Sequence, residues 1–135
     1  MHGMKWLWVY LASFAAFLAV DAVWLATMSG RFYRPRLGYL MRDEPALGVA
    51  LLFYVVYVAG VLVLAVSPAL DSGSALKAAA LGALLGLVAY GTYDITNLST
   101  VRDWPVIVTV VDLVWGTSLT ATISTIGYYV ARWLA

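Results

Sequence analysis

The chain contains no cysteine, a single histidine and few charged residues: Asp, Glu, Lys and Arg make up 11% of its 135 residues. Without cysteine it can form no disulfide, no thiolate metal site and no cysteine nucleophile. One histidine, His2, is too little for the usual zinc and haem sites, so we expect neither a metal nor a cofactor. The formal net charge is only +1, and without a long basic run we expect no nucleic-acid partner.

Apolar residues, in contrast, are plentiful. They make up 64% of the chain, whereas soluble domains are nearer to half apolar, so the composition is typical of a membrane protein. Four apolar spans are each long enough, at about 1.5 Å per residue, to cross a hydrocarbon core of roughly 30 Å. Because the connections are short, we expect an all-α fold: one domain, residues 1–135, forming an integral membrane bundle of four antiparallel transmembrane helices. The expected spans are about 6–28, 47–67, 75–97 and 105–133.

The connections give an orientation. Residues 29–45 carry four arginines and several helix breakers, so we expect a loop there, with a short interfacial helix at most. We expect Pro68 to end the second span. The first and third connections carry five Lys or Arg, against three beside the termini and in the second connection. The positive-inside rule then places both termini outside the cytoplasm.

Three aspartates interrupt the apolar spans. Asp21 and Asp94 each lie about seven residues before the end of their span, and Asp112 about seven after the start of the fourth. Antiparallel helices would bring all three to one level, roughly 10 Å below the same membrane face. Ionisable residues are rare inside a bilayer and often mark functional sites. We therefore predict that Asp21, Asp94 and Asp112 surround one central site as its catalytic residues.

Small and polar residues recur at helical spacing in the third and fourth spans. Such stripes allow membrane helices to approach each other closely, so we predict that they face inward. They are Gly82, Gly86, Tyr90, Asp94 and Asn97 in the third span, and Thr109, Asp112, Gly116, Thr120, Ser124 and Gly127 in the fourth.

Aromatic and polar side chains accompany the aspartates. Trp24 and Trp115 each follow an aspartate by three residues, and because their helices run in opposite directions we expect the two indoles on opposite sides of the carboxylate layer. Trp104, near a span end, is expected to lie in the interfacial aromatic belt. The residues that we predict to bind a substrate are Trp24, Tyr54, Tyr57, Tyr90, Tyr93, Thr96, Asn97 and Trp115.

The charge balance limits what this site can be. No Lys or Arg lies within the apolar part of any span, and three ionised carboxylates in a low dielectric would repel one another. The bundle must protonate some of them, admit water, bind a cation or borrow an arginine from the membrane face. A shared proton suits acid–base chemistry or a proton relay, whereas a bound cation suggests transport or metal-assisted chemistry.

Several of these segments also occur together in a known family. The order Tyr90-x-x-Tyr-Asp-x-Thr-Asn97, Trp104-Pro105 and Asp112-x-x-Trp-Gly116 resembles a bacterial family of small predicted membrane proteins, catalogued as a domain of unknown function. The resemblance covers nearly the whole chain. It implies a multi-pass protein of about four spans in the bacterial inner membrane, and it implies no activity.

The sequence leads to one functional hypothesis and leaves two others open. We predict that the carboxylate layer binds, and converts, a small lipid-phase molecule, with one aspartate as general acid and another as base. Isomerisation, cyclisation or hydration of an unsaturated, isoprenoid-like compound would fit without a cofactor. The alternatives are a proton- or cation-coupled small-molecule transporter, acting as a homodimer because four short helices enclose little volume, and a structural or partner-binding membrane subunit. In every case the lipid bilayer surrounds the helices.

Overall fold

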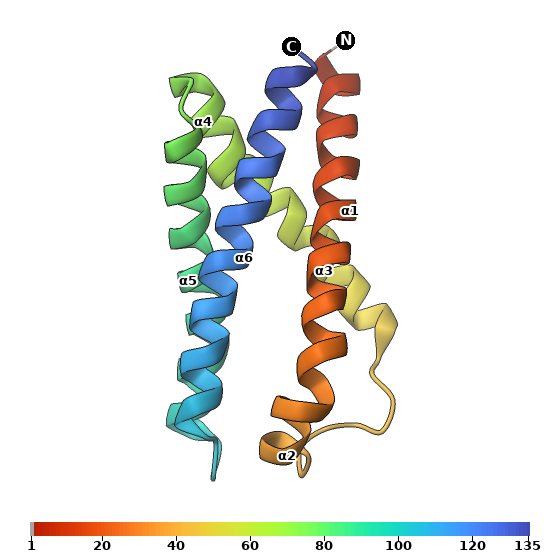
Figure 1. Ribbon diagram of the computed structural model, residues 1–135, viewed down its shortest axis with the longest axis vertical. Coiled ribbons are helices and arrows are strands. Elements are labelled where there is room, and N and C mark those ends of the chain that lie inside the picture. Colours follow the sequence, from red (N-terminus) through yellow and green to blue (C-terminus); the bar gives the residue numbers. More distant parts are fainter. Residues whose placement is uncertain (1) are drawn as a thin grey trace.

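The computed structural model describes residues 2–135, apart from the side chain of His2. It is built from four long helices, each apolar and long enough to span a membrane, and both ends of the chain lie at the same end of the bundle (Figure 1). The predicted all-α membrane fold is thereby confirmed, and the described residues form no strand. The elements are α1 (His2–Met28), η1 (Ser29–Tyr33), α2 (Arg34–Leu37), α3 (Leu47–Val61), η2 (Leu62–Val66), α4 (Ser67–Ser72), α5 (Ala75–Thr100) and α6 (Val106–Trp133).

Two of the four helices contain a π turn just before a proline. The turn η1 is followed by Arg34-Pro35, and η2 by Ser67-Pro68. Proline lacks an N–H group, and its ring collides with the carbonyl group one turn earlier in a regular helix. A widened turn relieves that collision and lets the helix continue. The first helix therefore continues to Leu37, although we expected a loop to begin after residue 28. The second continues to Ser72, although we expected it to end at Pro68.

The closest pair of helices is α5 and α6, which run side by side over most of their length (Figure 1). A Cβ atom on Gly86 would overlap the backbone carbonyl of Gly116, and one on Gly82 would overlap the side chain of Ser124. Gly82, Gly86 and Gly116 are all buried. The small stripes of the two helices thus face each other, as predicted, and they fix α5 and α6 as a rigid pair.

The helix formed by α3, η2 and α4 crosses the bundle at a steep angle. It starts beside α1, and its α4 end lies against α5 (Figure 1). Phe17, Val58 and Leu119 join the core where this helix crosses α1 and α6, and each is at most 2% exposed. Toward its start, α3 diverges from α5 (Figure 1).

The first and third connections pack against each other at the end of the bundle away from the termini. Leu37 and Trp104 are buried there with Val108, and Met41 packs against them. The hydroxyl group of Tyr39 donates a hydrogen bond of 2.9 Å to the backbone carbonyl of Asp103. This connection cluster, centred on Leu37, Trp104 and Val108, joins the first and third connections at this end of the bundle.

Candidate functional site

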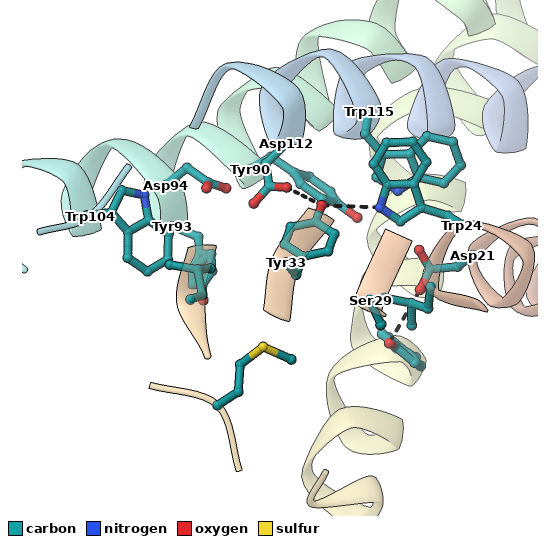
Figure 2. A pocket seen from close by; sticks show the side chains of 14 residues that line it. Asp21, Trp24, Ser29, Tyr33, Tyr90, Tyr93, Asp94, Trp104, Asp112 and Trp115 are labelled. Atoms are coloured by element: carbon teal, nitrogen blue, oxygen red, sulfur yellow. Dashed lines mark hydrogen bonds between the residues drawn. The ribbon is translucent and has the colours of Figure 1, made fainter. Parts of the chain in front are cut away.

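A cavity of about 320 Å³ lies directly beneath the connection cluster, among residues from α1, η1, α3, α5 and α6 (Figure 2). All three aspartates line it, together with five of the eight predicted substrate-binding residues. The lining consists of Asp21, Trp24, Leu25, Ser29, Tyr33, Leu37, Met41, Tyr54, Tyr90, Tyr93, Asp94, Trp104, Asp112 and Trp115.

Asp94 and Asp112 form the polar centre of the cavity. The close packing of α5 on α6 brings the two side chains together, and Figure 2 shows their carboxyl groups on neighbouring helices near each other. Asp94 is fully buried, and neither of its carboxyl oxygens has a hydrogen-bond partner among the described side chains and backbone groups. A buried carboxyl group without a partner is costly, and two adjacent ionised ones would repel. One proton held between Asp94 and Asp112 would remove both penalties.

Tyr33 connects the first helix to this pair. Its hydroxyl group donates a short hydrogen bond to Asp112, and the indole N–H of Trp24 donates to the Tyr33 oxygen at 3.2 Å (Figure 2). Trp24 and Tyr33 are nine residues apart, which in a regular helix is two and a half turns and would point them in opposite directions. The π turn η1, between them, changes that register, so the sequence pattern gave no indication that Tyr33 belongs to the site.

Asp21 occupies a separate part of the same cavity. It accepts a hydrogen bond of 3.4 Å from the hydroxyl group of Tyr54. Trp24 and Trp115 stack face to face, with ring centroids 4.1 Å apart and planes only 7° from parallel. The expectation that the two indoles lie on opposite sides of the carboxylates was therefore wrong.

The stack also shows that the three carboxylates do not share one level. Because Trp24 and Trp115 meet, Asp21 lies one helical turn to one side of them and Asp112 one turn to the other, an axial offset of roughly 9 Å. The depth of Asp21 was counted from Met28, whereas the first helix continues to Leu37. Among residues 3–135 no three acidic or histidine side chains come close enough together to hold a metal ion.

Trp104 forms part of the cavity wall. Our expectation that it would be exposed at the membrane interface was wrong. It is 7% exposed, and its indole N–H donates a 3.0 Å hydrogen bond to the Thr109 hydroxyl group. That hydroxyl group lies 3.3 Å from the backbone carbonyl of Asp94. The ring also packs edge-on against Tyr93. Trp104 therefore holds the start of α6 against the Asp94 turn of α5.

Three predicted substrate-binding residues lie outside this lining. The hydroxyl group of Tyr57 is buried, 2.6 Å from that of Thr120, and its ring faces a neighbouring cavity. Thr96 is exposed on the outer side of α5, because it is only two residues from the inward-facing Asp94. Asn97 is half-buried near the end of α5.

The neighbouring cavity, of about 420 Å³, extends the site toward the side of the bundle. It lies between α3 and α5 and shares Tyr90 and Tyr93 with the first cavity. Its remaining lining residues are Phe53, Tyr57 and Ala89. Phe53 and Tyr93 are both more than half exposed on the outer surface. The two cavities thus adjoin along Tyr90 and Tyr93 and reach the lipid-facing side where α3 diverges from α5.

The sequence matches a family described as a predicted membrane protein, DUF2177, over residues 6–129. The chain belongs to this family. No curated protein and no solved structure matches it. The DUF2177 match covers every residue that lines the two cavities.

Two aromatic residues that line the first cavity, Tyr33 and Trp104, were not predicted from the sequence, for different reasons. Tyr33 was counted as part of a loop and depends on a π turn that periodicity does not reveal. Trp104 stands beside Pro105 at a span end, a position that usually indicates an interfacial residue. Its place in the Trp104-Pro105 motif, on which we based the resemblance, was the one available signal.

Proposed function

We propose that this protein binds a small molecule from the lipid phase in the Asp94–Asp112 cavity and exchanges protons with it. The observation that carries the proposal is Asp94, a fully buried carboxyl group with no partner that faces a cavity. Buried polar groups are nearly always satisfied, and exceptions commonly mark functional sites. A bound molecule would provide the missing partner.

The surroundings of the two carboxyl groups suit opposite roles in acid–base chemistry. Tyr33 donates a hydrogen bond to Asp112, so Asp112 has a donor that can hold it in place. No donor among the described residues reaches Asp94, which leaves its carboxyl group free to contact the bound molecule. We propose Asp94 as general acid and Asp112 as general base: the acid protonates one atom of the bound molecule while the base removes a proton from another. Such an exchange, as in the migration of a double bond, needs no redox partner.

The shape of the two cavities favours access from the membrane. The cavity between α3 and α5 reaches the lipid-facing side past Phe53 and Tyr93, both more than half exposed. An apolar ligand would therefore enter from the bilayer between α3 and α5, with its polar end toward Asp94. We place the arginine-bearing connections in the cytoplasm of a bacterial cell, which puts the site near the cytoplasmic face of the inner membrane.

Native mass spectrometry of the gently solubilised protein tests the proposal. Ser29 lines the cavity and Ser118 is exposed on α6, so Ser29→Phe should fill the site while Ser118→Phe adds the same bulk outside it. We expect a co-purified small molecule with the wild type and Ser118→Phe, and its loss with Ser29→Phe. An empty wild type, or equal occupancy in the two variants, would refute the proposed binding.

Isotope exchange tests the proton chemistry separately. After incubation in D₂O, molecules released from the wild type should carry deuterium on carbon, and those from Asp94→Asn or Asp112→Asn should not. Movement of the unchanged molecule between the two sides of a proteoliposome, without deuterium uptake, would instead indicate a transporter.

A further inference from the structure

We infer that the molecule held in this cavity has a positively charged amine at the end of an apolar chain. The inference rests on the proposed function, since it concerns the ligand of the same cavity. It is argued from the charges, the walls and the shape of the site.

The charges that line the cavity are all of one sign. Asp21, Asp94 and Asp112 are its only ionisable side chains other than tyrosines, and no Lys or Arg lines it. The arginines of the two nearby connections are all exposed: Arg31, Arg34, Arg36, Arg42 and Arg102. Even with one proton shared by Asp94 and Asp112, that pair keeps one negative charge without a cation to balance it. A buried charge of this kind is stabilised by a counter-charge, and an ammonium group provides one.

The partnerless carboxyl group of Asp94 also fits an ammonium ligand. Both of its oxygens are buried acceptors without donors among the described residues. An alkylammonium group offers N–H donors and no acceptor. A neutral alcohol would supply one donor and leave the charge unbalanced, while a carboxylate would add a further negative charge.

The walls favour a cation as well. Aromatic rings surround the carboxyl groups, including the stacked Trp24 and Trp115 and the rings of Tyr33 and Tyr90 (Figure 2). The faces of such rings attract ammonium groups, most strongly when the site is shielded from water. Aromatic walls with a carboxylate are the chemistry by which proteins recognise organic ammonium ions.

The shape indicates that the amine is joined directly to its apolar chain. The first cavity, at about 320 Å³, has room for a small head group, and the adjoining cavity of about 420 Å³ between α3 and α5 is walled by Phe53, Tyr57 and Tyr93. A phospholipid head group would bring a phosphate next to the amine. With no cation in the lining to meet that phosphate, its charge would be repelled by Asp94 and Asp112.

The test compares ligands that share one apolar chain. Dodecylamine, dodecyltrimethylammonium, dodecanol and dodecanoate are titrated into the protein in phosphatidylcholine nanodiscs, and binding is read from tryptophan fluorescence. Dodecylamine should bind at least roughly tenfold more tightly than the alcohol, equal to about 1.4 kcal/mol, and dodecyltrimethylammonium, which has the charge but no N–H donor for Asp94, should bind less tightly than dodecylamine. Asp94→Asn or Asp112→Asn should abolish this preference, while Asp71→Asn, an equal change in net charge at an exposed site, should leave it unchanged. Thermal unfolding of each variant verifies that it is folded.

Each remaining outcome contradicts the inference in a recognisable way. Equal binding of dodecanol and dodecylamine, lost in Ser29→Phe, would overturn the positive charge and leave the proposed function intact. Competition by phosphatidylethanolamine nanodiscs would show that a phospholipid head group is the ligand. If the amines gave the same fluorescence change with Ser29→Phe as with the wild type, they would be partitioning into the lipid and not binding in the cavity. The inference would then be wrong. The proposed function would still be decided by the co-purified molecule.

Discussion

The glycine contact between α5 and α6 allows a quantitative test of how the site is assembled. Replacing Gly86 by alanine adds a Cβ atom that overlaps the backbone carbonyl of Gly116 and lies 2.7 Å from the hydroxyl oxygen of Thr120. A backbone atom cannot rotate away, so the two helices must separate. The separation acts on the site directly, because Asp94 lies about two turns from Gly86 on α5 and Asp112 about one turn from Gly116 on α6.

The expected loss of stability follows from two opposing effects. Overpacking of a well-packed contact costs about 1 to 3 kcal/mol, while exchanging glycine for alanine within a helix gains up to about 1 kcal/mol. Since the clash involves backbone, we take the upper part of the first range and expect Gly86→Ala to lose about 1 to 2 kcal/mol. Gly60 provides the matched control, because a Cβ atom there meets nothing within 4 Å. Gly60→Ala should be neutral or slightly stabilising.

Reversible unfolding in detergent–dodecyl sulfate mixtures, followed by circular dichroism, measures both variants against the wild type. Ligand binding should also weaken in Gly86→Ala, because the Asp94–Asp112 pair is pulled apart. If Gly86→Ala proved as stable as Gly60→Ala, α5 and α6 would not be in the close contact described above, and the origin of the carboxylate pair would need another explanation.

Three further predictions concern the site and its orientation. Tyr33→Phe removes two hydrogen bonds, the one that Tyr33 accepts from Trp24 and the one that it donates to Asp112. At about 0.6 kcal/mol for each hydrogen bond within a membrane, the variant should lose roughly 1 kcal/mol of stability in the same unfolding assay. A loss no larger than that of Tyr39→Phe, in the exposed connection, would contradict the central position of Tyr33. Asp94→Asn should unfold no more easily than the wild type, because the amide keeps the shape of the side chain and its N–H can donate to Asp112 in place of the shared proton. A clear loss of stability would indicate that Asp94 serves only to lock the bundle. Because the chain has no cysteine, a single cysteine introduced at exposed position 44 or 72 reports orientation. A membrane-impermeant maleimide should label the cysteine at position 72 in intact cells, and the cysteine at position 44 only after permeabilisation. The reverse labelling pattern would show that the topology is inverted.

The fold was largely predictable from the sequence, because its main determinant is continuous apolarity. Four spans of sufficient length, joined by short connections, leave few arrangements other than an antiparallel bundle. The α5–α6 contact was predictable for the same kind of reason, since glycines such as Gly82 and Gly86 at a spacing of four have a simple use in membrane helices.

The relative positions of the site residues were not predictable, because they depend on a π turn that hydrophobic periodicity does not indicate. The sequence placed Asp21, Asp94 and Asp112 near one end of the bundle, and all three line the same cavity. Their relative heights could not be obtained, because they depend on where the first helix ends. That helix passes through Pro35 only because a π turn precedes it, and neither propensity nor hydrophobic pattern indicates such a turn.

The π turn in the first helix has a consequence for how this site can vary. Trp24 and Tyr33 act together only because the turn between them holds one residue more than a regular helix would. Winding the same nine residues as a regular helix would rotate Tyr33 by about 100° relative to Trp24, whereas deleting one residue of the turn, such as Gly30, would restore regular winding with Tyr33 still facing the same way. In this segment the winding and the number of residues must therefore change together, because a change in one alone would turn Tyr33 away from Trp24.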